Sequence, residues 1–325
     1  DIMSLFEIMS KLDGIVWGTP FTVTLLAAGF IFVLLSKGFV FRHFGHIWKN
    51  TLGTVLSSEA RNSKDGKVSP FQAVCVAVGG CVGTGNISGV AAAIAVGGPG
   101  AVFWMWLWAF FAMTVKMCEA TLGSYYRKKN ANGEYVGGSY YYMEEGIAKE
   151  KGWKIGYVLA WLFALCFFSM FLSGSQASVL AESLHAGYNV PMIPFVIVYT
   201  LFMFYIVWKG VPRIAKTLSK AVPVMCVLYL LAGIIIIVMN IGNLPSVIIS
   251  IFSNAFTETA AVGGFVGASV KIALAQGIAR AINSNEAGMG TSPMIHAAAD
   301  TVHPVRQGLW GVMEVFIDTI IICSI

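Results

Sequence analysis

Five glycines fall within residues 79–89, in the middle of a long apolar stretch, and the polar residues Thr84 and Asn86 lie among them. A continuous helix is unfavourable for this composition, because each glycine costs about 1 kcal/mol relative to alanine. We therefore predict a local unwinding that exposes backbone N–H and C=O groups to a buried ligand. The alternative is an ordinary membrane helix in which the glycines permit close packing.

The groups exposed by such a break favour two kinds of ligand. A half-helix amino terminus carries partial positive charge and free N–H groups, which suit a carboxylate. We assign this role to the amides of Thr84 and Gly85. Unpaired carbonyls suit a small cation. The Asn86 side-chain oxygen and the carbonyls from Gly79 to Val82 are therefore candidate cation ligands, and an α-amino acid with a bound Na⁺ needs both kinds of group.

A second polar interruption lies in the apolar stretch 262–284. Gln276, Gly277 and Arg280 place an amide, a glycine and a guanidinium near its middle. Polar side chains within a membrane span face protein or a water-filled cavity. This stretch therefore resembles the first one in combining backbone freedom with polarity at one depth.

The elements that position these residues are membrane helices. The 325 residues are 57% hydrophobic and 11% charged, with a mean hydropathy of +0.75, whereas soluble domains have about 25% charged residues. This composition excludes a soluble enzyme, a nucleic-acid-binding protein and a disordered chain. Apolar runs of roughly 20 residues match membrane helices and exceed the strands of a barrel. The predicted spans are 15–35, 71–96, 101–123, 157–184, 194–208, 222–239, 262–284 and 307–325.

Basic residues predict the orientation of these spans. Most of the 21 Lys and Arg residues fall in the loops after the first, third, fifth and seventh spans, whereas Lys11 lies on the other side. By the positive-inside rule these basic loops are cytoplasmic, so we expect the amino terminus outside. The six cysteines fall within spans and the histidines have no ligand spacing, so we predict neither disulfides nor a transition-metal site.

The two polar interruptions are five spans apart, which is an odd number and gives the two units opposite orientation. Paired interrupted helices in inverted halves point to the binding site of a secondary transporter. In a single transmembrane domain 1–325, residues 71–239 form a first repeat, residues 262–325 begin a second, and helix 15–35 is additional. Because the last apolar run reaches Ile325 without a polar flank, we expect an incomplete second repeat.

A channel and an intramembrane enzyme are the alternatives to a transporter. Channels usually repeat their selectivity filter by oligomerisation. No Ser/His, paired-Asp or metal-ligand arrangement lies at membrane depth to perform chemistry. We therefore predict a transporter rather than an enzyme, without an organic cofactor.

Three motifs occur in order along the chain: Gly-Thr-Gly-Asn-Ile-Ser-Gly at 83–89, Gly-Gly-Pro-Gly-Ala-Val-Phe-Trp-Met-Trp at 97–106, and Ser-Asn-Glu-Ala-Gly-Met-Gly at 284–290. Together they resemble the alanine or glycine:cation symporter family of the amino acid–polyamine–cation superfamily. The second motif usually closes with Gly, where this chain has Ala112. The resemblance extends from about residue 15 to the end.

This resemblance implies a five-plus-five inverted-repeat fold of the leucine-transporter type, with broken helices in spans two and seven. It implies import of alanine or glycine by symport with Na⁺, or H⁺ in some members, across the cell (plasma) membrane. A transporter of another small amino acid or amine on the same fold is the alternative. The expected partners are the substrate and the lipid bilayer, with no nucleic acid and no obligate protein partner.

The resemblance also implies that the middle of the fourth span lines the substrate pocket. Phe163, Phe167, Phe168 and Phe171 have helical spacing there, and Gln176 follows one to two turns later. Aromatic stripes often only pack, but a site for a one-carbon side chain needs bulk to exclude larger ones. We therefore assign Phe167, Phe168, Phe171 and Gln176 to the substrate site.

In the seventh span, Gln276 and Gly277 lie at the expected break, with the amino group or the carboxylate of the substrate as their target. Arg280 and Glu286 are expected to pair with each other and hold the inner half-helix, rather than to contact substrate.

Overall fold

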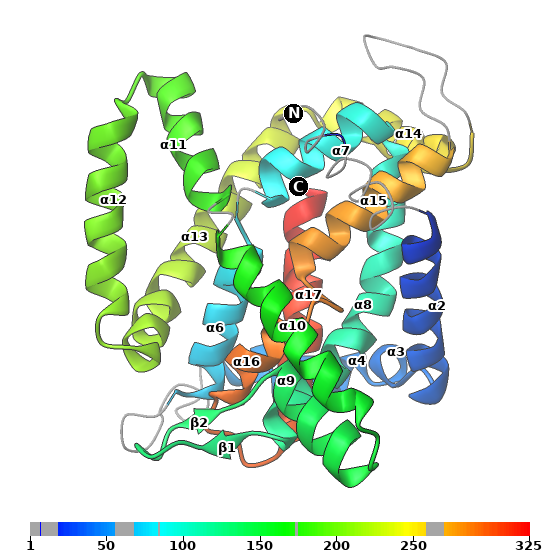
Figure 1. The fold of residues 1–325 in the computed structure, drawn as a ribbon. Coiled ribbons are helices and arrows are strands. Elements are labelled where there is room, and N and C mark those ends of the chain that lie inside the picture. Colours follow the sequence, from blue (N-terminus) through cyan, green and yellow to red (C-terminus); the bar gives the residue numbers. More distant parts are fainter. Residues whose placement is uncertain (1–6, 8–18, 56–67, 84, 173–174, 258–269) are drawn as a thin grey trace.

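The computed structural model describes residues 7, 19–55, 68–83, 85–172, 175–257 and 270–325. Within this part the chain is mostly helical (Figure 1), with one short antiparallel hairpin that pairs β1 (Lys128–Lys129) with β2 (Tyr135–Val136). Several of the helices are strongly apolar. The predicted class, a helical membrane protein, agrees with this architecture.

The helix α8 (Gly100–Tyr125) lies at the centre of the bundle. It packs against α17 (Pro304–Val315), α15 (Val270–Asn285) and α16 (Ser292–Ala297). Trp108 and the alanines around it are fully buried in this core. Small residues beside large ones allow helix axes to approach closely, which is how membrane helices gain packing energy.

The helix α6 (Pro70–Cys81) begins with a capping box. The Ser69 hydroxyl accepts a hydrogen bond from the Gln72 amide N–H, and the Gln72 side chain accepts one from the Ser69 N–H. After the helix ends, a π-helical segment, η2 (Gly85–Gly89), continues into α7 (Val90–Gly97). The helical stretches before and after the interruption are bent by 48° relative to each other.

Within the described residues, three helical stretches are long and apolar enough to cross a membrane: α8, α13 (Val211–Met239) and Pro304–Ser324. The bent α6–α7 pair is a fourth if it counts as one span. The sequence predicts eight spans, so the remaining predicted spans correspond to shorter apolar helices or extend beyond the described residues. The shorter apolar helices are α2 (Thr19–Leu35), α10 (Ile155–Leu172), α12 (Met192–Val207) and α14 (Leu244–Phe256).

The start of α13 differs from the prediction, because the helix begins at Val211 rather than at residue 222. Arg213, Lys216 and Lys220 therefore lie on its first turns and not in a loop. Proline in the first turn favours a helix start, and α13 has one there. Long basic side chains can leave an apolar helix and reach the polar boundary of the membrane, so they do not prevent the helix from starting early.

Two further differences concern helix number. The predicted span 157–184 covers most of α10 and part of α11 (Ser175–Tyr188), with residues 173–174 between them outside the described part, while α14 is a helix that was not predicted. The sequence signal of α14 is weak because the helix has only 13 residues, fewer than a full span needs. Residues 262–269 of the predicted seventh span lie outside the described part.

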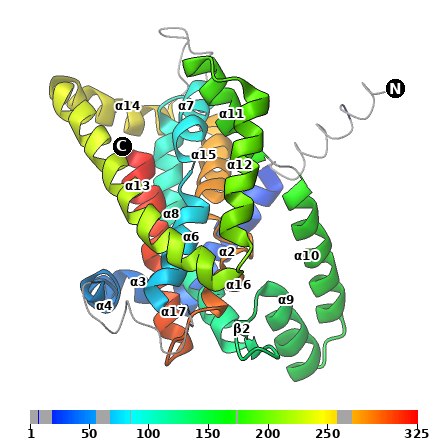
Figure 2. The same ribbon diagram turned by 90° about the vertical axis from the view of Figure 1, so that its left-hand side faces the viewer.

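The helices α11 and α12 lie at the edge of the bundle in Figure 1, and α10 lies at its edge in Figure 2. They expose large apolar side chains, including Trp161 on α10 and Phe202 on α12, which suits contact with lipid. The remaining short elements are α3 (Phe39–Arg42), α4 (Phe44–Asn50), η1 (Leu52–Thr54), α9 (Ser139–Tyr142), η3 (Met143–Glu150), η4 (Ile241–Asn243), η5 (Phe316–Ile321) and η6 (Ile322–Ser324).

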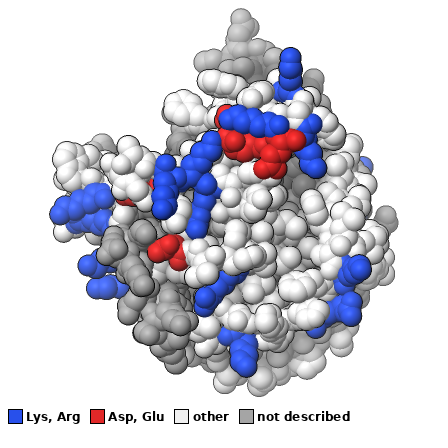
Figure 3. Space-filling model, turned by 90° about the horizontal axis from the view of Figure 1, so that it is seen from below, with Lys and Arg blue, Asp and Glu red and all other residues white. Residues whose placement is uncertain are grey.

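Figure 3 views the end of the molecule that carries the β1–β2 hairpin, and Lys and Arg side chains gather on this face. Acidic side chains lie among them. Hydrogen bonds from Lys128 and Lys149 lower the pKa of the Glu145 carboxyl. The gathering of basic side chains at one end fits the predicted basic loops, and the assignment of this end to the cytoplasm stays a prediction.

Candidate functional site

Asn86 lies in η2, directly after the interruption, and its side chain spans the break. The side-chain oxygen accepts a hydrogen bond from the Gly83 N–H at 2.9 Å, on the α6 side. The Nδ2 group donates to Asp318 Oδ1 at 2.7 Å and to Ser284 Oγ at 2.9 Å. The residue is only 2% exposed. Asn86 therefore joins the interrupted helix to two other elements, α15 and η5.

The Asp318 carboxylate is fully buried and is held by neutral donors. Besides Asn86, it accepts hydrogen bonds from Ser284 Oγ at 2.7 Å and from Thr319 Oγ1 at 2.9 Å. Among the described residues, no Lys, Arg or His forms an ion pair with it within 4.0 Å. A buried carboxylate without a cation is costly, so this position favours a bound cation or a proton.

We call Asn86, Ser284, Asp318 and Thr319 the Asp318 cluster. The Nδ2 group of Asn86 faces the carboxylate, because its side-chain oxygen accepts from the Gly83 N–H. The cluster thus brings a carboxylate and two hydroxyls within one buried volume. Hard cations prefer oxygen ligands of these types. Asn86 is the predicted cation ligand in the cluster, and the other three members were not predicted. Asp318 could have been found from the sequence, because an ionisable residue within an apolar run marks a functional site by default.

A second buried ionic group lies beside the Asp318 cluster. Lys116 Nζ is 3.0 Å from Glu314 Oε1 and donates to the Asn285 backbone carbonyl at 2.7 Å. Glu314 Oε2 is 3.0 Å from His296 Nε2, and Gln307 Nε2 is 2.8 Å from His296 Nδ1. All of these side chains are fully buried. The group connects α8, α16, α17 and the last turn of α15, which gives it a structural role.

The second interruption lies at residues 286–291 and not at Gln276 and Gly277, because α15 is continuous from Val270 to Asn285. A side chain at Gly277 would collide with the Ala101 carbonyl oxygen and with Trp104 Cβ. The glycine therefore permits close packing of α15 against α8, and the predicted break there is wrong. The same sequence feature allows either close packing or unwinding, and packing prevails at this position.

The segment 286–291 turns sharply between α15 and α16. Glu286, Gly288 and Gly290 have positive φ values of 53°, 88° and 75°. The Glu119 carboxylate on α8 accepts hydrogen bonds from the Gly288 and Gly290 N–H groups, both at 3.2 Å. Glu119 thus holds the turn against the central helix.

The expected pair of Arg280 and Glu286 does not form. Thr291 Oγ1 donates to Glu286 Oε2 at 2.5 Å, and the Arg280 guanidinium lies instead against Gly89 in η2. The turn after Asn285 separates the two side chains, because Glu286 has already left the helix.

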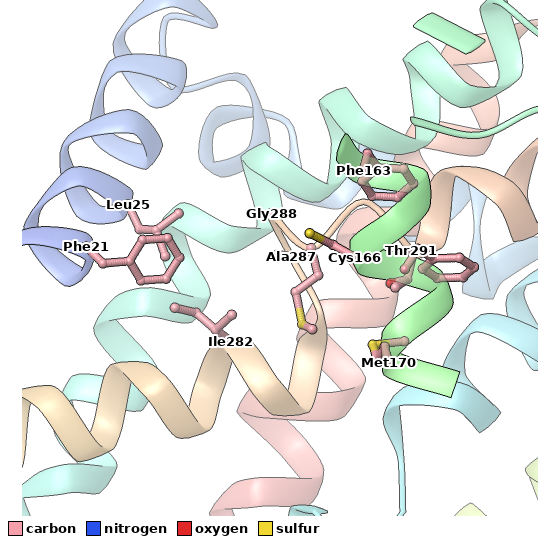
Figure 4. Close-up of a pocket in the computed structure, with 11 residues that line it drawn as sticks. Phe21, Leu25, Phe163, Cys166, Met170, Ile282, Ala287, Gly288 and Thr291 are labelled. Atoms are coloured by element: carbon pink, nitrogen blue, oxygen red, sulfur yellow. The ribbon is translucent and has the colours of Figure 1, made fainter. Parts of the chain in front are cut away.

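A pocket of about 280 Å³ opens between α2, α10 and the turn 287–291 (Figure 4). Phe167 lines it, and its ring stacks on that of Phe163 with centroids 5.7 Å apart. Phe168 is 63% exposed and does not line this pocket. The lining is mostly apolar, consisting of Phe21, Leu25, Phe163, Cys166, Phe167, Met170, Ile282, Ala287, Gly288, Met289 and Thr291.

The remaining predicted site residues are less informative. Among the described residues, a Cβ placed on Gly85 would meet no atom within 4 Å, so this part of the chain leaves open space beside it. Gly79 packs closely on Val222 of α13, and Val82 is buried directly after α6. Gln276 lies on the α15 face that meets Gly97 of α7. Thr84 and the side chains of Phe171 and Gln176 lie outside the described part.

The apolar helices, the bent α6–α7 pair and the buried Asp318 cluster together are features of a membrane transport protein. The sequence model of the Sodium:alanine symporter family matches residues 3–325. The chain therefore belongs to this family, which is a family of transporters and not of enzymes.

Several relatives are similar along nearly the whole chain. The "Uncharacterized transporter YflA" of Bacillus subtilis is 43% identical over 314 residues, which are 95% of this chain and 64% of the relative. The "Sodium/alanine symporter AgcS" of Methanococcus maripaludis is 36% identical over 328 residues, 99% of this chain and 70% of the relative. The "Probable sodium/glutamine symporter GlnT" of Bacillus subtilis is 38% identical over 320 residues, 98% and 64% respectively. The chain thus spans about two thirds of the length of these relatives.

Proposed function

We propose that the protein imports a small neutral amino acid, alanine or glycine, by symport with Na⁺ through alternating access. The observation that carries this proposal is the buried Asp318 carboxylate, which is surrounded by neutral oxygen and nitrogen groups at the interrupted helix. The family and the name of the AgcS relative support alanine and Na⁺ as the transported species.

Cation binding at the Asp318 cluster would couple the binding of the cation to the binding of the amino acid. A bound Na⁺ neutralises Asp318 and draws Asn86, Ser284 and Thr319 towards itself, which fixes η2 relative to α15 and η5. Gly85, which has open space beside it among the described residues, lies four residues before Gly89 on the same segment. Ordering of this segment by the cation lowers the conformational cost of binding an amino acid next to it, and that shared free energy is the coupling.

A proton is the alternative coupling ion, because protonation also neutralises Asp318. The carboxylate and the hydroxyls of Ser284 and Thr319 favour Na⁺, since a proton needs only one acceptor, whereas a metal cation needs several ligands. Glutamine is an alternative substrate, because the GlnT relative is named for it. The aromatic pair Phe163 and Phe167 beside the pocket favours a smaller side chain.

The proposed architecture is the five-plus-five inverted repeat, with the α6–α7 bend as the break of the first repeat. We place the amino terminus outside and the basic end of Figure 3 in the cytoplasm, on the positive-inside rule. We also propose that the protein lies in the plasma membrane and needs neither an organic cofactor nor an obligate protein partner.

The test is uptake of radiolabelled alanine by proteoliposomes that contain the full-length protein. We expect an inward Na⁺ gradient to drive accumulation, and Asp318→Asn to lower uptake at least about tenfold, because loss of a buried charged partner costs several kcal/mol. Glu182→Gln, an acid-to-amide change at an exposed position on α11, is the matched control and should retain uptake.

Accumulation that ignores both Na⁺ and H⁺ gradients would contradict the proposal. An H⁺ gradient that replaces Na⁺ would assign the proton as the coupling ion. Saturable counterflow of labelled alanine distinguishes a transporter from a channel.

A further inference from the structure

Arg280 extends from α15 towards the interrupted helix. Its guanidinium lies so close to Gly89 that a Cβ on this residue would collide with Nη1 and Cζ. Gly89 is the last residue of η2, three residues after Asn86. The absence of a side chain at Gly89 therefore allows the guanidinium to reach the backbone of the segment that also carries the Asp318 cluster.

Within the part of the chain that the structure describes, Arg280 has no hydrogen-bond acceptor and no ion-pair partner. The nearby carboxylates have other donors. Glu286 accepts from Thr291, Asp318 accepts from three neutral groups, and Glu314 is paired with Lys116 and His296. A half-buried guanidinium at membrane depth without an anion is expensive, and such groups are retained for function.

Gln276 lies one helical turn before Arg280, so the two side chains share one face of α15. This face meets α7, because the Cβ of Gln276 is 3.1 Å from a Cβ placed on Gly97. The structure records no hydrogen bond for the Gln276 amide among the described residues either. A guanidinium and an amide thus project from one face, and both supply N–H donors. Guanidinium groups bind carboxylates through two parallel hydrogen bonds.

We infer that Arg280 binds the carboxylate of the transported amino acid, with Gln276 as a second donor. This inference rests on the proposed function. Gly85 and Gly89 are four residues apart on the interrupted helix, about 6 Å at 1.5 Å per residue, so a carboxylate near Arg280 lies beside the open space at Gly85. The cation at Asp318 and the carboxylate at Arg280 then occupy two sides of one short segment. Such a site requires a carboxylate and excludes simple amines.

The test compares ligand binding by the purified full-length protein and its Arg280→Gln and Arg280→Lys variants. We expect Arg280→Gln to raise the Kd for alanine by about 10- to 100-fold, because it removes a charge-assisted bidentate contact. Arg280→Lys keeps the positive charge but cannot form two parallel hydrogen bonds, so its Kd for alanine should lie between those of the wild type and Arg280→Gln. The thermal shift produced by Na⁺ alone should be unchanged, since Asp318 keeps its ligands. Lys271→Gln, at an exposed position on the same helix, is the matched control.

Alaninamide supplies a readout that a merely structural role would not change. The wild-type protein should prefer alanine strongly over alaninamide, and Arg280→Gln should lose most of that preference. If Arg280→Gln leaves the alanine Kd within about threefold of the wild type, or removes the Na⁺ shift together with alanine binding, the inference is wrong.

Chloride offers the same charge to a guanidinium, so the measurements are repeated with gluconate in place of chloride. A chloride-dependent shift that disappears in Arg280→Gln, with unchanged alanine affinity, would overturn the assignment to the substrate. A wild-type protein that responds to Na⁺ but binds no alanine would overturn the proposed function itself, before any variant is compared.

Discussion

Asn86 Nδ2 and Asp318 Oδ1 are 2.7 Å apart, although 232 residues separate them in the sequence. Since the other end of the same amide accepts from the Gly83 N–H, one side chain connects both sides of the helix interruption to a buried carboxylate. The interruption is therefore held by side-chain contacts as well as by backbone geometry. Asn86 therefore links the Asp318 carboxylate directly to the Gly83 N–H.

Replacing Asn86 with Leu should weaken the dependence of uptake on Na⁺ more than it weakens alanine recognition. Leucine removes the amide that donates to Asp318 at 2.7 Å and that ties the carboxylate to the Gly83 N–H. We expect the Na⁺ concentration for half-maximal uptake to rise at least about tenfold, equivalent to about 1.4 kcal/mol. The measurement is alanine uptake over a range of Na⁺ concentrations, with the alanine KM determined at saturating Na⁺. If the half-maximal Na⁺ concentration and the alanine KM rise by the same factor, Asn86 is not a cation ligand.

The Asp318 cluster also shows where sequence reasoning succeeds and where it stops. Asn86 was predicted as a cation ligand because glycines and polar residues concentrate around it in one apolar stretch, and that role stays a prediction. Asp318 was not predicted, although its carboxylate interrupts an equally apolar run, because glycines do not cluster around it and the nearest in that run is Gly311. Ser284 lies within a recognised motif, but only the fold shows that it contacts η2. Contacts between residues distant in the sequence depend on helix packing, and periodicity along one helix carries no information about them.

The glycine at position 277 shows a different limit. Glycine in a membrane helix either unwinds the backbone or permits a neighbour to approach, and the local sequence is compatible with both. Because the Ala101 carbonyl oxygen lies against Gly277, the glycine at this position permits close packing. At Gly85, where a Cβ would meet nothing within 4 Å, packing is not the reason for the glycine.

Replacing Gly85 with Leu should abolish uptake without lowering expression. A Cβ on Gly85 meets no atom of the described residues within 4 Å, so a leucine side chain would extend into the volume proposed for the substrate. The matched control is Gly187→Leu on α11, where a Cβ also meets nothing within 4 Å and no substrate is expected. Uptake and surface expression are measured for both variants. Normal transport by Gly85→Leu would place the substrate elsewhere.

Replacing Lys116 with Met should destabilise the protein by about 3–5 kcal/mol, because Glu314 then remains buried without its ammonium partner. The double variant Lys116→Met with Glu314→Gln should regain part of this loss, since it no longer buries an unpaired charge. Thermal unfolding in detergent gives the order of stability. Lys149→Met removes an exposed ion pair and should change stability by less than about 1 kcal/mol. A double variant less stable than Lys116→Met would show that the pair is not the source of the effect.

Replacing Phe167 with Ala should allow larger amino acids, such as leucine, to compete with alanine for uptake. Phe167 lines the pocket and stacks on Phe163, so its removal enlarges the pocket, and on our proposal that this pocket selects the substrate it would then admit larger side chains. Phe168→Ala is the matched control, because this neighbouring ring is 63% exposed and does not line the pocket. Inhibition of labelled alanine uptake by leucine is compared in the two variants. If leucine inhibits neither or both to the same extent, then the pocket between α2 and α10 does not select the substrate, and Phe167 only packs against Phe163.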